Sequence, residues 1–223
     1  MIYAIIGIGY LIDILFIVHD EAKHDGLSIV LKTLASACFV TLSIVLYNNA
    51  NSKELALYIV LALVADLFGD FILILRNITD KHHDTIFIGG TLCFFIGHIF
   101  LMIMLYINNP SVLLKSFIYT FVIFILFGLP LLKTLETKKT MKTIGAIYVF
   151  FIIYIQAYGI CSLVNVETKF ELAFLFGYFL FAVSDIVLII QKFGKVKSNA
   201  LQPIYRLSYF ISQVIIALSI AYL

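Results

Sequence analysis

The residues of this sequence that could carry out chemistry are carboxyl groups inside long apolar stretches. Asp185 lies within the run Phe176–Phe193, and Asp66 and Asp70 lie within an earlier run. A charged side chain deep in a bilayer costs roughly 2.5–3.5 kcal/mol, so it is usually paired, protonated or functional. Asp66 and Asp70 are four residues apart and therefore share one face of a helix. Burial favours the neutral form of a carboxyl group, which suits proton transfer.

Other polar residues lie at similar depths in the predicted helices. The whole group comprises Lys32, Asp66, Asp70, His98, Ser184, Asp185, Tyr209 and Gln213. Counted from one common side at about 1.5 Å per residue, they lie about 6–20 Å deep, with His98 deepest. Five helices thus place polar groups in the same half of the bilayer. This agreement indicates a central polar cavity that opens toward that side.

Further polar residues have simpler structural explanations. Tyr148, Gln156 and Ser184 are suited to hydrogen bonds between helices. Lys32 and Arg206 could extend toward the membrane interface, and we expect this for Arg206. The residues near loops, which we expect to be solvated, are Asp13, His19, His82 and His83. Three buried carboxyl groups beside a lysine and a histidine still favour a functional cavity.

The elements that position these residues are membrane-spanning helices. The 223 residues are 63% hydrophobic and 13% charged, and the mean hydropathy is +1.10. Eight apolar runs have the length that a helix needs to cross a bilayer. They lie near residues 2–18, 28–47, 55–75, 85–107, 112–131, 143–163, 170–191 and 203–222. The sequence therefore predicts an all-α membrane protein with one polytopic domain, 1–223, and no basic stripe for nucleic acid.

The distribution of basic residues predicts the orientation of the helices. Twelve lysines and arginines lie in or beside the loops after the first, third, fifth and seventh segments, against three on the other side. The twelve are Lys23, Lys32, Arg76, Lys81, Lys133, Lys138, Lys139, Lys142, Lys192, Lys195, Lys197 and Arg206. The positive-inside rule places these loops in the cytoplasm and both termini outside. The cavity would then open toward the cytoplasm.

The two halves of the chain also resemble each other. A shift of 115 residues places Gly69-Asp70 on Ser184-Asp185 and His98 on Gln213. This predicts two parallel repeats of four helices, an arrangement known in membrane folds. The third, fourth, seventh and eighth segments would form the pseudo-symmetric centre.

Five short motifs of this sequence resemble the lysoplasmalogenase family of eight-helix membrane proteins, also called YhhN-like. They are Lys32 early in the second helix, Gly69-Asp70, Gly90-x-x-x-Phe94-x-x-x-His98, Gly177-x-x-x-Phe181-x-x-Ser184-Asp185 with Phe193 after it, and Tyr209-x-x-Ser212-Gln213. The order and depth of the motifs match across the second to eighth segments. The chain departs from the family pattern at Thr33, where proline is common, and at Asp66.

The resemblance implies cleavage of the vinyl ether bond of lysoplasmalogens, which gives a fatty aldehyde and glycerophosphocholine or glycerophosphoethanolamine. Such a bond hydrolyses once a proton reaches its β-carbon and water captures the cation, so one carboxyl group must be protonated and another ionised. We expect Asp70 and Asp185 to be this catalytic pair. The remaining residues of the group would bind substrate or support the pair, with no metal or cofactor. Lysophospholipid and membrane lipids would be the partners.

Two other functions fit the same residues. Buried Asp, Lys and His also occur in proton- or ion-coupled transporters of small solutes. We expect no helix interrupted by glycine or proline around the site, which argues against a transporter. A metal-dependent lipid hydrolase using Asp66, Asp70, His98 and Asp185 is weakly indicated, because the sequence has no HExxH spacing.

Overall fold

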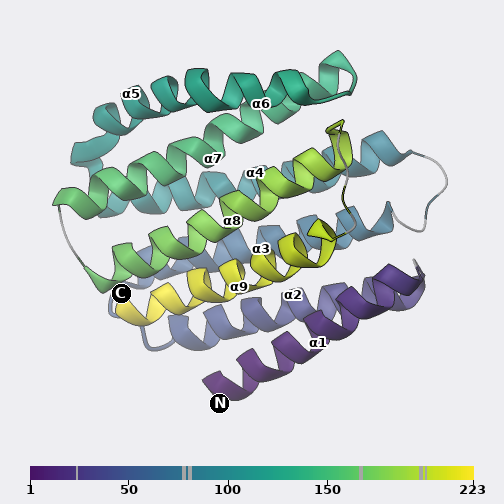
Figure 1. The fold of residues 1–223 in the computed structure, drawn as a ribbon. Coiled ribbons are helices and arrows are strands. Elements are labelled where there is room, and N and C mark those ends of the chain that lie inside the picture. The colour runs from purple at the N-terminus through teal and green to yellow at the C-terminus, as the bar shows by residue number, and fades with distance from the viewer. Residues whose placement is uncertain (24, 77–78, 80–81, 166–167, 196–197, 199) are drawn as a thin grey trace.

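The chain folds into a bundle of helices. The computed structural model describes all residues except 24, 77–78, 80–81, 166–167, 196–197 and 199 (Figure 1). Its α-helices are α1 (Ile2–Ala22), α2 (Gly26–Tyr47), α3 (Lys53–Leu75), α4 (His83–Asn108), α5 (Leu113–Ile123), α6 (Leu129–Thr134), α7 (Lys139–Asn165), α8 (Lys169–Phe193) and α9 (Leu201–Ser219). Short 3-10 turns lie at Pro110–Val112 and Ile220–Tyr222.

The predicted number of membrane-spanning segments is confirmed. Among the described residues, eight helical segments are long and apolar enough to cross a membrane, and each predicted run coincides with one of them. The fifth segment, Pro110–Thr134, is not continuous α-helix. A π-helical stretch, Phe124–Gly128, joins α5 to α6 just before Pro130. None of these residues lines the cavity described below, so the interruption lies outside the predicted site.

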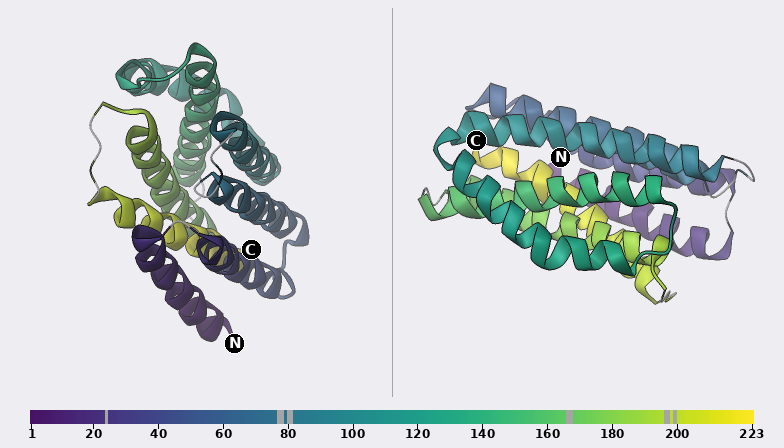
Figure 2. Two further views of the ribbon diagram at one scale, coloured as in Figure 1. Left: turned by 90° about the vertical axis from the view of Figure 1, so that its right-hand side faces the viewer. Right: turned by 90° about the horizontal axis from the view of Figure 1, so that it is seen from above.

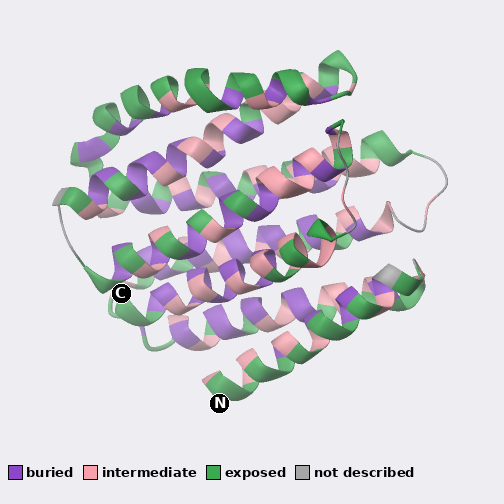
Figure 3. Ribbon diagram, in the orientation of Figure 1, coloured by how far each residue is buried: buried purple, intermediate pink, exposed green. Residues whose placement is uncertain are grey.

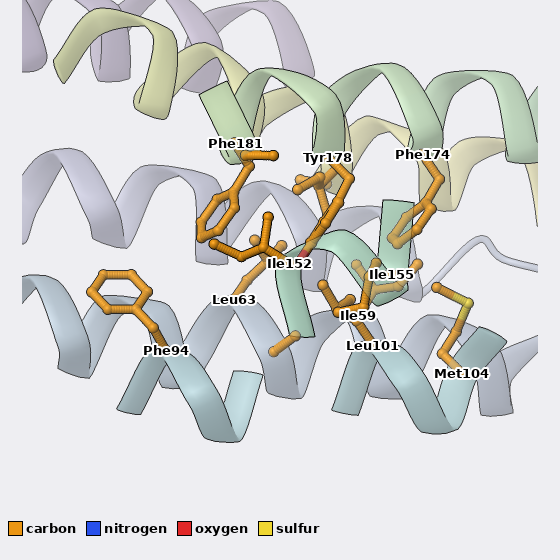
Figure 4. Packing of buried hydrophobic residues seen from close by; sticks show 14 of the residues in the cluster. Ile59, Leu63, Phe94, Leu101, Met104, Ile152, Ile155, Phe174, Tyr178 and Phe181 are labelled. Carbon is orange, nitrogen blue, oxygen red and sulfur yellow. The ribbon is translucent and has the colours of Figure 1, made fainter. Parts of the chain in front are cut away.

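The outer surface of the bundle is apolar, as a lipid-facing surface must be. Large hydrophobic side chains such as Leu114, Phe121 and Phe127 are exposed along the fifth segment, and Figure 3 shows α5 largely exposed. The first and fifth segments lie at opposite edges of the bundle (Figures 1 and 2). Between them the core is rich in aromatic rings, and Figure 4 shows Phe94, Tyr178 and Phe181 in this packing.

Neighbouring helices approach each other closely where α4 carries glycine. A Cβ atom on Gly90 would lie 2.6 Å from the Leu73 side chain of α3, and one on Gly97 would lie 2.6 Å from Asp66 Oδ1. Real Cβ atoms do not approach other atoms so closely, so these positions accept only glycine without a shift. Small residues at a membrane helix interface allow this tight packing.

The ends of the helices divide between the two ends of the bundle. The last residues of α1, α3, α6 and α8 lie at one end, and both termini of the chain lie at the other (Figure 1). Of the twelve basic residues expected on the loop side, Lys81 and Lys197 lie outside the described residues. At the loop end, the Glu136 backbone N–H donates to Phe193 O over 2.6 Å, which joins the α6–α7 loop to the end of α8.

The contacts between helices are compatible with the predicted repeat. The offset of 115 residues carries α3 onto α8 and α4 onto α9. The pair α3–α4 thus corresponds to the pair α8–α9, and within each pair the two helices pack closely. The offset also carries α2 onto α7. The contact of α2 with α9 then corresponds to the contact of α7 with α4, and both contacts are present. The repeat itself stays a prediction.

Candidate functional site

A cavity lies at the loop end of the bundle, enclosed by residues of α1, α2, α3, α4, α7, α8 and α9 and of the α6–α7 loop. Five of the eight predicted site residues line it: Lys32, Asp70, Ser184, Asp185 and Tyr209. Most of its wall is apolar and aromatic, with Leu73, Phe94 and Ile144 among the lining residues. A largely apolar cavity with a few convergent polar groups is typical of a small-molecule site.

Asp70 accepts bonds from two helices and pairs with a cation. Its Oδ2 accepts hydrogen bonds from Ser36 Oγ (2.5 Å) and from Tyr209 OH (3.0 Å). Lys32 Nζ lies 3.3 Å from Oδ1. Lys32 and Ser36 are four residues apart on α2 and therefore present the same helix face to Asp70. The Lys32 ammonium also lies 4.4 Å from the centroid of the Tyr209 ring, which fixes it beside the carboxylate.

Asp185 has different neighbours. The Tyr148 hydroxyl of α7 donates a short hydrogen bond to Asp185 Oδ2. The structure shows no ion pair to Asp185 from the part of the chain that it describes. The other carboxyl oxygen, Oδ1, has no hydrogen bond to a described side chain. Asp185 is 6% exposed and lines the cavity, so its carboxyl group is accessible from the cavity alone.

Ser184 lies beside Asp185 but bonds within its own helix. Its hydroxyl donates to Phe181 O over 3.0 Å, and the residue is buried at the cavity wall. This bond satisfies the hydroxyl without a second helix.

Asp66, His98 and Gln213 form a second, deeper group that does not line the cavity. Gln213 Nε2 donates to Asp66 Oδ2 over 2.9 Å and so joins α9 to α3. The His98 ring stacks on Tyr148 with centroids 5.2 Å apart, and its Nε2 has no hydrogen-bond partner among the described residues. Because Tyr148 contacts both His98 and Asp185, it connects the deep group to the cavity.

Two expectations about charged residues were wrong. Asp13 was expected to be solvated, yet it is fully buried in α1. Arg206 was expected to extend to the interface, yet its side chain is 11% exposed and its Nη2 lies 2.6 Å from Asp20 Oδ2. The two errors have different causes. Asp13 lies on the face of α1 that packs into the bundle, whereas Arg206 finds a partner because α1 continues to Ala22, four residues beyond its predicted end, so that Asp20 is helical and buried.

Sequence reasoning missed Ser36 and underrated Tyr148. Ser36 follows Lys32 by one helical turn, and this spacing was the available signal for it. Tyr148 was noted only as a helix-to-helix hydrogen-bonding group, and it does make such a bond, with the carboxyl group of Asp185 as its acceptor.

The donor set does not suggest a metal centre. Among the described residues, no group of three or more His, Cys, Asp or Glu side chains is arranged to hold a metal ion. The four residues considered as ligands are divided between the cavity, with Asp70 and Asp185, and the deeper group, with Asp66 and His98. We do not carry the metal-dependent hydrolase forward.

Comparisons with known proteins give one match. The model of the YhhN family matches residues 27–220, which is most of the chain. No curated protein and no solved structure matches.

Proposed function

The chain belongs to the YhhN family, which includes lysoplasmalogenases, and we propose that it hydrolyses the vinyl ether bond of lysoplasmalogens within the membrane. The observation that carries this proposal is the pair Asp70 and Asp185, which line one cavity with unlike partners. Family membership supports a lysoplasmalogenase-like activity, and the unlike carboxyl groups fit its chemistry.

The reaction needs an acid and a base in one site. A carboxylic acid transfers its proton to the β-carbon of the vinyl ether, which leaves an oxocarbenium ion on the α-carbon. A carboxylate stabilises this cation and takes a proton from the attacking water as the C–O bond forms. The resulting hemiacetal collapses to a fatty aldehyde and glycerophosphocholine or glycerophosphoethanolamine. Two carboxyl groups in unlike surroundings can divide these roles, as in glycosidases.

We assign Asp185 as the acid and Asp70 as the carboxylate. Lys32 stabilises a negative charge on Asp70, and Ser36 and Tyr209 donate hydrogen bonds to it. Asp185 has no such cation among the described residues, and Tyr148 engages only one of its oxygens. Its second oxygen is then available to hold the proton toward the cavity.

The other predicted residues have supporting roles in this proposal. Lys32 and Tyr209 orient Asp70 and stabilise its negative charge, whereas Tyr148 orients Asp185. His98 stacks on the Tyr148 ring and so holds it in place. The hydrogen bond from Gln213 to Asp66 fixes α9 against α3, the helix that carries Asp70. We further propose that the cavity opens to the cytoplasm, because the basic residues cluster at its end of the bundle.

The experiment that tests this function uses the purified protein with two lipids. A lysoplasmalogen should release aldehyde, and the saturated ether analogue of the same chain length should release none, because it has no double bond to protonate. Aldehyde release is measured with a coupled dehydrogenase. Cleavage of both lipids, or of neither, would contradict the proposed chemistry.

The transporter alternative makes the opposite prediction. If the buried carboxyl groups move protons with a solute, reconstituted protein would show proton-dependent flux without any loss of lipid. The only interrupted segment in the described residues, around Phe124–Gly128, lies away from the cavity, so no observation favours this function over hydrolysis.

A further inference from the structure

In the described part of the chain, more basic than acidic side chains line the cavity. Four basic side chains line the cavity: Lys32, Arg76, Lys192 and Arg206. Lys32 pairs with Asp70, and Arg206 pairs with Asp20, which lies outside the cavity lining. Among the described residues, the lining contains two carboxyl groups, Asp70 and Asp185. A concave, partly apolar surface with more basic than acidic side chains attracts and concentrates anions.

Arg76 presents to this cavity a guanidinium of which one nitrogen has no hydrogen-bond partner among the described residues. It follows the last residue of α3, six residues beyond Asp70. Its guanidinium lies over the Phe87 ring, 5.5 Å from the centroid, and its Nη1 is buried without a hydrogen-bond partner in the described part of the chain. A buried donor left unpaired costs free energy, and an arriving acceptor would remove that cost.

Arg206 presents a second such group from α9. Its Nη2 is held by Asp20, and the guanidinium lies 5.2 Å from the centroid of the Phe16 ring. Its Nη1 is buried and lacks a hydrogen-bond partner among the described residues. Each arginine is therefore positioned by an aromatic ring and has one donor nitrogen unused. Planar guanidinium groups fit the oxygens of a phosphate better than an ammonium does.

We propose that Arg76 and Arg206 form an anion subsite for a phosphate ester at the mouth of the cavity. We assign Lys32 to Asp70 and not to the phosphate, because its ammonium lies 3.3 Å from Asp70 Oδ1. Six residues of helix separate Arg76 from Asp70, which corresponds to about 9 Å along the axis. A glycerol backbone can bridge this separation, with its phosphate at the arginines and its ether bond at the carboxyl groups.

This subsite refines the proposed function, and the two can be tested separately. The same chemistry suits the phosphate of a lipid headgroup and a free water-soluble phosphate ester. A phosphate on a lipid would bind together with a chain in the apolar wall, whereas a free ester would bind at the arginines alone.

The test measures binding of compounds that cannot be hydrolysed. An alkyl-ether lysophosphatidylcholine, the alkylglycerol of the same chain, and glycerol 3-phosphate are titrated into wild-type protein and Arg76→Gln in detergent. Wild type should bind the phospholipid at least 10-fold more tightly than the alkylglycerol. Arg76→Gln should lose about 10-fold for the phospholipid only. Lys133→Gln, which removes an exposed lysine of α6 outside the cavity, should change neither.

Each outcome decides one point. Equal binding of phospholipid and alkylglycerol by wild type, or an equal loss of both in Arg76→Gln, would overturn the subsite. Binding of glycerol 3-phosphate alone with the same dependence on Arg76 would show a soluble ester as the ligand. Selective phospholipid binding without any vinyl ether cleavage would keep the subsite and remove the proposed function.

Arg206→Gln gives a second measurement. This variant leaves Asp20 without its cation, so its melting temperature is measured beside wild type. If it is folded, its phospholipid affinity should also fall and its alkylglycerol affinity should not. An unchanged phospholipid affinity in the folded variant would remove Arg206 from the subsite.

Discussion

The surroundings of Asp70 and those of Asp185 differ, although the offset of 115 residues aligns Asp70 of α3 with Asp185 of α8. Asp70 has an ammonium ion and two hydroxyl donors, whereas Asp185 has one phenol. Two identical side chains can therefore perform opposite steps of one reaction, because the neighbouring residues and not the residue type set their charge.

Most of this difference lies on α2 and α7. The offset of 115 residues that carries Asp70 onto Asp185 carries Lys32 onto Ile147 and Ser36 onto Phe151. The cation and hydroxyl of α2 are thus replaced by apolar groups on α7, and Tyr148 supplies the remaining donor. Tyr209 of α9 corresponds to Phe94 of α4, so a third donor differs as well. If the halves arose from a repeat, the asymmetry that the proposed catalysis requires arose on α2 and α7 and on α4 and α9.

The largest expected effect comes from removing either carboxyl group. Asp185→Asn and Asp70→Asn should each lower aldehyde release by about 1,000-fold or more, because proton transfer and cation stabilisation are both needed. Folding is checked by size-exclusion chromatography in detergent. Substantial activity in either variant would end the acid–base assignment.

Lys32→Met should have the next largest effect. It removes the cation from Asp70 and leaves a buried carboxylate, so we expect about 100-fold lower kcat and about 3 kcal/mol lower stability. The double variant Lys32→Met with Asp70→Asn should recover part of that stability, since no buried charge is left unpaired. Additive losses in thermal melts would contradict the pairing of Lys32 with Asp70.

Tyr148→Phe should have a moderate effect on the Asp185 side alone. It deletes the hydroxyl that orients Asp185 and keeps the ring that stacks on His98. We expect kcat to fall about 10-fold with little change in KM, because the ground-state binding surface is preserved. Tyr158→Phe, which removes a hydroxyl bonded to Asn109 O away from the cavity, is the matched control and should leave kcat unchanged.

Asp25→Ala should have the smallest effect and supplies a baseline for the others. Asp25 Oδ1 accepts bonds from His19 and from the Leu27 and Ser28 N–H groups, so it caps the helix that carries Lys32. We expect a slightly lower melting temperature and unchanged kcat. A loss of kcat here would show that the position of α2, and not the charge of Lys32, limits the reaction.

Asp25 also makes the stability of the protein depend on pH in a predictable direction. The hydrogen bond from His19, followed by those from the backbone, holds the pKa of Asp25 below its usual range. The stabilisation is therefore present at neutral pH and is lost as the pH falls below about 4, through the lowered pKa. Melting curves of wild type and Asp25→Ala should converge in that acidic range.

The sequence predicted the spanning helices because apolar length alone identifies them, and depth along each helix placed Lys32, Asp70, Asp185 and Tyr209 at one end. It could not give the partners of each carboxyl group. Whether Ser36 or Tyr148 bonds to a carboxylate depends on how helices rotate about their axes, and apolar sequence leaves that rotation open because lipid and core accept the same side chains. The burial of Asp13 depended on the rotation of α1 in the same way, and the pairing of Arg206 with Asp20 depended on where α1 ends, which the polar residues near Asp20 obscured.

The π-helical stretch at Phe124–Gly128 has a consequence for the history of the chain. A π-helix has one residue more per hydrogen-bonded turn than an α-helix, so it is where a helix can absorb an inserted residue without shifting either flank. Related chains with one residue fewer in the fifth segment should therefore carry their gap inside this lipid-facing helix. An alignment that allows gaps only in loops would shift by one position every residue between the π-helical stretch and the loop where it placed the gap.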